Sequence, residues 1–128
     1  MIRAAVAWGP AALWAAVLFF LSAQPDPPGA GVFDWVPAGD KLAHFLLYAV
    51  LGALLALGRG EQGEPPHWTL VATGALYGAS DEWHQSYVPG REVSVLDWAA
   101  DVGGVAAGYW VGLSLLRLRA TRRALRTR

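Results

Sequence analysis

The chain contains no cysteine. Disulfide bonds and thiolate metal sites are therefore excluded, and the redox compartment cannot be read from cysteine usage. Charged residues are also scarce, at 16% of the 128 residues, whereas soluble domains carry about 25%. Lys plus Arg equals Asp plus Glu, so the net charge points to no particular partner. A chain of this length has room for one domain.

Apolar residues dominate instead, at 55% of the sequence. A helix of about 17 to 25 mostly apolar residues can cross the hydrocarbon core of a bilayer. Four such stretches are present, separated by links rich in Pro, Gly or polar residues, which do not continue a helix. We therefore predict an all-α integral membrane protein: a four-transmembrane-helix bundle in a single domain, residues 1–128. The predicted helices cover residues 4–23, 42–58, 68–85 and 95–116, followed by a basic tail at 117–128.

The first apolar stretch has some features of a cleaved signal peptide, since Arg3 precedes it and small residues lie near Ala23. The apolar part of a signal peptide is about 7 to 15 residues long. Here it is about 18 residues long, so we expect an uncleaved helix. Pro10 should kink this helix or mark a late start.

The cations divide unequally between the two sides of such a bundle. Arg3, Arg59 and the six arginines after Leu116 fall on one side. Lys41 and Arg91 fall on the other. The positive-inside rule therefore predicts that both termini are cytoplasmic. The basic tail could also be read as an arm that binds nucleic acid, but we favour a topology signal that contacts anionic lipid, with no nucleic-acid partner.

This topology gathers ionisable residues from several segments at the outer face. Charges are common at helix ends, and an aspartate at an N-terminus suits the helix dipole, which accounts for Asp40 and Asp97. Asp101 is different, because it lies about 9 Å further along its helix than Val95. An isolated carboxylate at that depth costs several kcal/mol. We therefore expect Asp101 to face the interior of the bundle and to have a partner.

Each of the three later helices has a polar stripe at its outer end. Residues spaced by four lie on one helix face, as do Asp40, His44 and Tyr48, then Asp81 and Gln85, and then Asp97 and Asp101. We predict one shared site, with a hydrogen-bonded cluster of His44, Glu82, Gln85, Arg91 and Asp97. The candidate ligand-binding residues are Asp40, Lys41, His44, Tyr48, Glu82, Gln85, Arg91, Asp97 and Asp101.

Around this site, six carboxylates and two cations leave a formal charge of −4 when the histidines are neutral. Protonated carboxyl groups, a metal ion or a cationic group on a ligand would each relieve the repulsion. No spacing matches a strong metal signature, because DEWHQ is not HExxH. We therefore predict no metal site and no cofactor.

Glycines recur at helical spacing in the third and fourth stretches. Gly74 and Gly78 lie in the third, and Gly104, Gly108 and Gly112 lie in the fourth. Small residues at this spacing let helix backbones approach closely in a membrane. We expect these glycines to serve packing.

Taken in order, the segments LSAQ, DKLAHFLLYAVLG and DEWHQSYVPGREVSVLDWAADVGG resemble the VanZ-like family, from Ser22 to about Gly108. Members of this family are small bacterial integral membrane proteins, and one raises resistance to the glycopeptide teicoplanin. The resemblance thus implies a multi-pass protein of the bacterial cytoplasmic (inner) membrane and a link to antibiotic resistance, but no reaction. The family pattern matches at Ser22, Gln24, Asp40, Lys41, His44, Tyr48, Glu82, Gln85, Pro89, Gly90, Arg91, Asp97 and Gly104.

One position departs from the family pattern. Many members carry Asn where this chain has Asp101. A neutral amide makes similar hydrogen bonds without the cost of a buried charge. The departure suggests that Asp101 is protonated or paired, and it weakens any mechanism that needs Asp101 as a base.

Two classes of function stay open. In the first, the outer site binds the head group of a cell-envelope lipid or lipid-linked cell-wall precursor, without chemistry. In the second, the chain is a membrane-embedded hydrolase or transferase acting on a lipid-linked substrate. The candidate catalytic residues are then His44 or Glu82 as the base and Asp97 as the orienting group, while Arg91 and Lys41 hold an anionic group.

We favour binding over catalysis, because pairs of a histidine and a carboxylate also occur in purely structural networks. A channel is disfavoured, since the cytoplasmic halves of the predicted helices are apolar. The identity of the ligand and the oligomeric state stay open.

Overall fold

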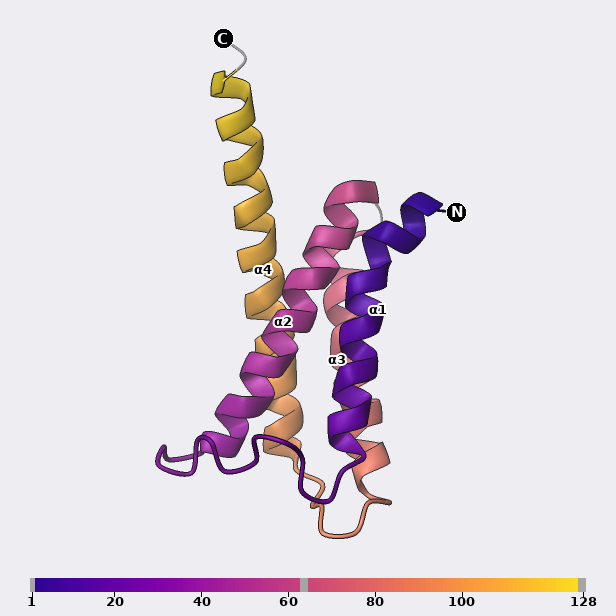
Figure 1. Cartoon of the computed structure of the whole chain (residues 1–128), viewed down its shortest axis with the longest axis vertical. Coiled ribbons are helices and arrows are strands. Elements are labelled where there is room, and N and C mark those ends of the chain that lie inside the picture. The colour runs from indigo at the N-terminus through magenta and orange to yellow at the C-terminus, as the bar shows by residue number, and fades with distance from the viewer. Residues whose placement is uncertain (1, 63–64, 127–128) are drawn as a thin grey trace.

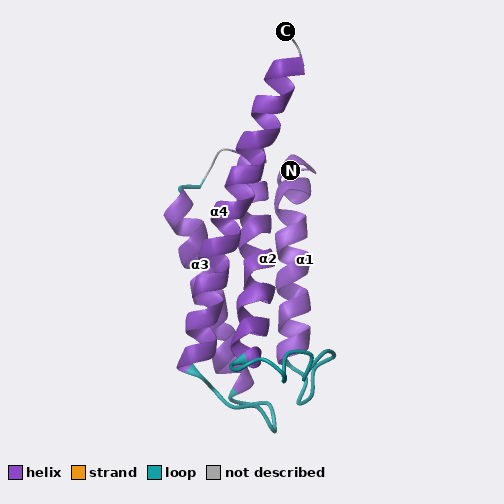
Figure 2. Cartoon of the chain, turned by 90° about the vertical axis from the view of Figure 1, so that its left-hand side faces the viewer, coloured by secondary structure: helices purple, strands orange, loops and turns teal. Residues whose placement is uncertain are grey.

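The computed structural model describes residues 2–62 and 65–126. These ranges form four α-helices and no strand (Figure 2). The helices are α1 (Ile2–Ser22), α2 (Gly39–Gln62), α3 (His67–Gln85) and α4 (Val95–Arg126). The predicted all-α class is therefore confirmed, and each predicted helix has a counterpart.

Three of the four helices are long and apolar enough to cross a membrane: the segments Arg3–Ser22, Gly39–Gly60 and Val95–Arg126. The remaining helix, α3, is the shortest of the four. Its last turns carry Asp81, Glu82 and His84, so its apolar part is shorter than in the others.

Two helices extend beyond their predicted ends. α2 begins at Gly39 and runs to Gln62. α4 continues past residue 116 to Arg126, so the basic segment is helical as far as it is described. This segment contains no Gly or Pro, and its Leu, Ala and Arg residues are among the best helix formers. Pro10 lies inside α1, whose first turns bend away from the rest of the helix in Figure 1, as a proline in a helix interior causes.

The four helices run alternately up and down (Figure 1). The start of α1 and the end of α4 lie at one end of the bundle, and the two loops at residues 23–38 and 86–94 lie at the other. α2 packs most extensively against α4, while α1 lies against α2 and α3 against α4. We refer below to the terminal end and the loop-bearing end of the bundle.

Glycines on α4 allow the close contact between α2 and α4. A β-carbon added at Gly104 would collide with the Phe45 carbonyl, and one added at Gly108 would collide with the Ala49 carbonyl. The contact is reciprocal, because a β-carbon at Gly52 of α2 would collide with the Val105 carbonyl. The expectation that the spaced glycines serve packing is therefore confirmed for this pair of helices.

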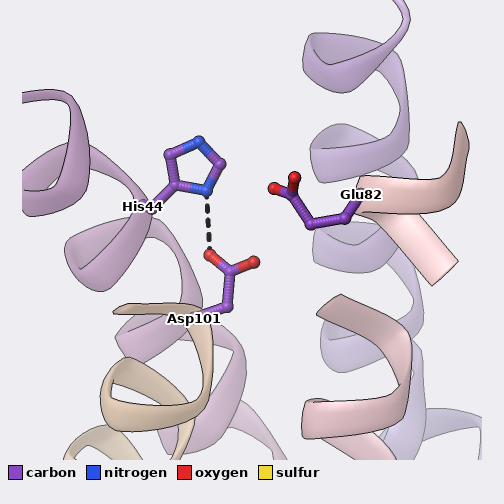
Figure 3. Close-up of side chains that lie close together, drawn as sticks. All are labelled: His44, Glu82 and Asp101. Atoms are coloured by element: carbon purple, nitrogen blue, oxygen red, sulfur yellow. Dashed lines mark hydrogen bonds and ion pairs between the residues drawn. The ribbon is translucent and has the colours of Figure 1, made fainter. Parts of the chain in front are cut away.

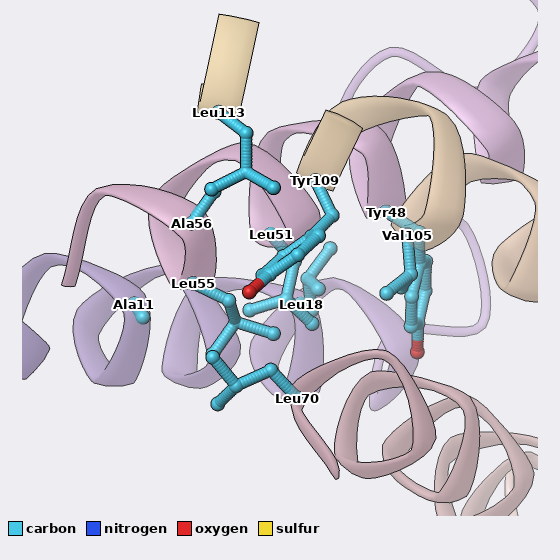
Figure 4. Close-up of a cluster of buried hydrophobic side chains, with 10 residues drawn as sticks. All are labelled: Ala11, Leu18, Tyr48, Leu51, Leu55, Ala56, Leu70, Val105, Tyr109 and Leu113. Atoms are coloured by element: carbon cyan, nitrogen blue, oxygen red, sulfur yellow. The ribbon is translucent and has the colours of Figure 1, made fainter. Parts of the chain in front are cut away.

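An apolar core fills the bundle beside this contact (Figure 4). Val105 and Tyr109 of α4 are fully buried in it, together with Leu51 and Leu55 of α2 and Leu70 of α3. Gly74 lets α3 pack closely against Val105 of the core, because an added β-carbon there would lie 2.6 Å from Val105 Cγ1. The core thus fixes how α2, α3 and α4 are rotated relative to one another.

The loop at residues 23–38 is a series of turns rather than an extended linker. The N–H groups of Ala30, Val32, Asp34 and Val36 each donate to the carbonyl three residues earlier. Gly29 and Gly31 have φ angles of 87° and 82°, which glycine adopts without steric cost. Compact turns hold this loop close to the helix ends (Figure 1).

Candidate functional site

The predicted site residues lie at the loop-bearing end of the bundle, where α2 begins, α3 ends and α4 begins. The acids on α3 and α4 are buried rather than solvated: Glu82 is 5% exposed, Asp97 8% and Asp101 0%. Buried carboxylates are rare unless they are paired or bind a cation. The partner of each acid therefore decides what the site can do.

Lys41 joins the start of α2 to the start of α4. Its ammonium group contacts the Asp40 carboxylate and lies 2.7 Å from Asp97 Oδ1. Both carboxylates thus share one cation at the rim of the site. Asp40 lies on α2 beside Lys41, so the contact with Asp97 is the one that joins the two helices.

His44 pairs with Asp101 deeper in the bundle. His44 Nδ1 lies 2.9 Å from Asp101 Oδ1, at hydrogen-bond distance. The other ring nitrogen, Nε2, is 4.0 Å from Asp97 Oδ2. Asp101 therefore faces the bundle interior and has a partner, as its depth in the fourth helix predicts.

The end of α3 is fastened to the start of α4 through a serine. The Ser94 N–H donates to Glu82 Oε2 at 2.9 Å. The Ser94 hydroxyl accepts a bond from the Asp97 N–H at 3.2 Å, which makes Ser94 the N-cap of α4. Sequence reasoning missed Ser94, although a serine three residues before an acidic residue at a helix start is a known capping pattern.

Asp81 was also left out of the candidate ligand-binding residues. It is 6% exposed, and the Tyr48 hydroxyl donates a hydrogen bond to Asp81 Oδ2 at 3.1 Å. The signal was present in the sequence, because Asp81 precedes Gln85 by four residues on the same helix face.

Figure 3 shows that Glu82 approaches the pair of His44 and Asp101 from the opposite side. One ligand atom from each of these three residues lies within 4.8 Å of the others. His44 and Glu82 therefore lie close together at this end of the bundle. The spacing along the sequence gave no metal signature, because the three residues come from three different helices.

The predicted single hydrogen-bonded cluster is wrong in its details. Within the described residues, the bonds fall into separate groups: His44 with Asp101, Tyr48 with Asp81, and Glu82 with the Ser94 backbone. No side-chain hydrogen bond or ion pair joins Gln85 or Arg91 to them in residues 2–62 and 65–126.

A cavity of about 570 Å³ lies between these residues and the loop at residues 23–38. The candidate residues that line it are Asp40, Lys41, His44, Tyr48, Gln85, Arg91 and Asp97. Glu82 and Asp101 do not line the cavity. A larger hollow of about 840 Å³ near Arg59 and His67, at the other end of the bundle, contains none of the candidate residues.

The sequence profile of the VanZ/LLP1 family matches residues 7–117. This chain belongs to the VanZ/LLP1 family. The match takes in most of the chain, including every candidate site residue and both loops at the loop-bearing end. Family membership and the three membrane-capable helices together make this VanZ/LLP1 chain a VanZ-like membrane protein. No curated protein and no solved structure matches it.

Proposed function

We propose that all four helices of this VanZ/LLP1 protein cross the bacterial cytoplasmic membrane, with both termini in the cytoplasm. α3 runs alongside the other three helices over most of the bundle (Figure 2). Arg3, Arg59 and the arginines of α4 from Arg117 to Arg126 lie toward the terminal end, and Lys41 and Arg91 lie at the loop-bearing end. The positive-inside rule then directs the cavity to the outer leaflet.

The cavity then binds the anionic head group of an envelope lipid or of a lipid-linked cell-wall precursor. The observation that carries this proposal is the position of Arg91. Its side chain lines the cavity, yet within residues 2–62 and 65–126 it lies within 4.0 Å of no carboxylate oxygen. A planar guanidinium group fits phosphate or carboxylate with two parallel hydrogen bonds.

The rest of the cavity suits such a ligand. Its volume of about 570 Å³ falls in the range of about 300 to 1,000 Å³ that is usual for small-molecule sites. Val32 and Phe33 of the loop line one side and offer apolar contact. Trp35 in the same loop is 81% exposed, and tryptophan is favoured at the membrane interface.

The acids in the cavity restrict which head group fits. Lys41 is already engaged by Asp40 and Asp97, so Arg91 is left as the main site for a negative group. Asp81 and Gln85 also line the cavity and would accept or donate hydrogen bonds. A head group that combines phosphate with hydroxyl groups satisfies both requirements. Binding of a lipid-linked precursor would link the protein to teicoplanin-type resistance, because it would alter the access of the drug to its target at the membrane.

Catalysis is the second candidate function, and the pairing of His44 with Asp101 favours it. His44 lines the cavity, and a buried carboxylate orients its ring. A general base held by a carboxylate is a common arrangement in hydrolases and transferases. In this version Asp101, rather than Asp97, would orient the base.

The substitution Arg91→Lys tests the head-group proposal, because lysine keeps the charge but loses the planar fork. We expect it to abolish a teicoplanin-resistance phenotype and to reduce the phospholipid or precursor that copurifies with the protein, at unchanged membrane levels. Arg119→Lys, on the exposed end of α4, is the matched control. Full resistance and unchanged lipid copurification in Arg91→Lys would remove Arg91 as the clamp.

A separate measurement distinguishes binding from catalysis. His44→Gln removes the candidate base but keeps a polar side chain at the cavity. If the protein is a binder, the copurifying lipids should be the same species in wild type and in His44→Gln. An altered lipid that accumulates only with the wild-type protein, detected by mass spectrometry, would favour the enzyme.

A further inference from the structure

We propose that His44, Glu82 and Asp101 bind a divalent transition-metal ion, of the class of Zn²⁺ or Mn²⁺, behind the head-group cavity. This inference goes beyond the proposed binding of a head group and does not depend on it. It rests on the geometry of three side chains and on two buried carboxylate oxygens.

The geometry brings three ligands from three helices to one point. His44 comes from α2, Glu82 from α3 and Asp101 from α4, and their ligand atoms lie within 4.8 Å of one another. In Figure 3 the Glu82 carboxylate points toward His44 and Asp101 across the space between them. Zinc ligands lie about 2.0 to 2.2 Å from the ion, so the three side chains would move closer together on binding.

Two oxygens at this point have no hydrogen-bond partner in the described part of the chain. They are Glu82 Oε1 and Asp101 Oδ2, and both are buried. The other oxygen of each carboxylate is occupied, because Glu82 Oε2 accepts from the Ser94 N–H and Asp101 Oδ1 bonds His44. A buried carboxylate oxygen without a partner is costly, and a cation would remove that cost.

The two cations that the structure describes at the loop-bearing end do not fill this role. Lys41 is engaged by Asp40 and Asp97 at the rim. Arg91 lies at no ion-pair distance from Glu82 or Asp101. A divalent ion would balance the two carboxylates when His44 is neutral. The alternative is that protons neutralise Glu82 and Asp101, and metal binding separates the two explanations.

The donor set indicates the kind of ion. Mg²⁺ and Ca²⁺ prefer oxygen ligands alone, whereas an imidazole together with carboxylates suits Zn²⁺, Mn²⁺ or Fe²⁺. The N–H of Ser94 would fix the orientation of the Glu82 carboxylate, as groups around metal ligands commonly do. His44 also lines the cavity, so an ion has a path from the loop-bearing end.

Metal content of the purified full chain is the test. The protein is produced with an affinity tag that lacks histidine, purified in detergent, stripped with a chelator, incubated with Zn²⁺ or Mn²⁺ and desalted. We expect elemental analysis to find one bound ion per chain. Glu82→Gln and Asp101→Asn should each weaken binding by about tenfold or more, since changes even outside the ligand set cost about 10- to 100-fold.

Two variants serve as matched controls. Glu92→Gln removes an exposed carboxylate of the neighbouring loop. His84→Gln removes the histidine two residues after Glu82 on α3, whose ring packs in a tilted arrangement against Phe19 of α1. Both should bind the ion as the wild type does. Circular dichroism and gel filtration check that each variant is folded.

A second measurement keeps the proposal testable if a variant does not fold. Co²⁺ bound to the wild-type protein should give visible absorption bands of a nitrogen- and oxygen-ligated ion, and Zn²⁺ should displace it. Wild-type protein that retains no metal above a detergent blank would overturn the proposal in favour of protonated carboxyl groups. Binding that survives both Glu82→Gln and Asp101→Asn, or that His84→Gln and Glu92→Gln weaken equally, would also overturn it.

Discussion

The pair of helices α2 and α4 has two different halves. Toward the terminal end, Gly108 and Gly112 bring the backbones together against Ala49 and Ala53. Toward the loop-bearing end, the same two helices meet through charged and polar side chains, with His44 against Asp101 and Lys41 against Asp97. The first half holds the helices in place, and the second half carries the candidate site residues.

The difference shows how a small membrane protein holds charged groups at depth. Helix association in lipid depends on close van der Waals contact, which the glycine half provides. Because the backbones are fixed there, His44 lies within hydrogen-bond distance of Asp101. The Asp101 carboxylate, which is 0% exposed, therefore has a partner. The first three predictions below each disturb one half and leave the other intact, and the last changes neither.

The largest effect should come from removing the partner of the buried acid. His44→Leu leaves Asp101 without its hydrogen bond, and breaking a buried pair costs about 3 to 5 kcal/mol. We expect a marked loss of thermal stability in detergent, measured by the temperature at which the protein aggregates. Adding Asp101→Leu should restore most of that stability, because no uncompensated acid is then left. A double variant as unstable as His44→Leu would show that the pair is not the cause.

The glycine half should be the next most sensitive. A β-carbon at Gly108 would collide with the Ala49 carbonyl, and overpacking costs about 1 to 3 kcal/mol. We expect Gly108→Ala to lower the yield of monodisperse protein on gel filtration. Gly103→Ala is the matched control, because its added β-carbon would lie 3.6 Å from the Phe45 ring, an ordinary contact. Equal yields from the two variants would contradict the packing described for α2 and α4.

A smaller effect is expected at the junction of the polar half with its loop. Ser94→Ala removes the hydroxyl that caps α4, which costs about 0.5 to 2 kcal/mol. The bond from the Ser94 backbone to Glu82 should survive. Ser114→Ala is the control, because that hydroxyl bonds the Trp110 carbonyl within the helix. The difference in unfolding temperature between the two variants measures the cap, and the absence of a difference would mean that the cap contributes nothing.

The smallest effect should come from the exposed end of α4. Arg119→Gln lies outside both halves, and exposed substitutions usually change stability by less than about 0.5 kcal/mol. The unfolding temperature should match the wild type. A clear destabilisation would mean that Arg119 makes a stabilising contact, although its side chain is exposed in this fold.

The sequence was sufficient for part of this picture. The apolar stretches predicted the four helices, and the spacing of four predicted which polar residues share a face. The depth of Asp101 predicted that it has a partner. Each of these inferences uses one segment at a time, where helical periodicity decides the outcome.

Pairings between segments were harder to predict. Arg91 was expected to reach the carboxylates, yet His44 and Lys41 are the residues that contact them. The choice depends on how α2 and α4 are rotated about their axes, and backbone contacts at Gly52, Gly104 and Gly108 set that rotation. No single segment contains this information. The extension of α4 was missed for a different reason, since the predicted helix was bounded by the apolar stretch, which ends at Leu116.

That extension changes how the terminal arginines act. In a helix that leaves the membrane upright, each residue adds about 1.5 Å of height, so Arg126 would stand about 13 Å further from the lipid surface than Arg117. Electrostatic attraction decays over a Debye length of about 8 Å at physiological ionic strength. The arginines nearest the bundle would therefore feel the anionic lipids far more strongly than those at the tip. The arginine count alone would overstate the attraction of this segment to the membrane.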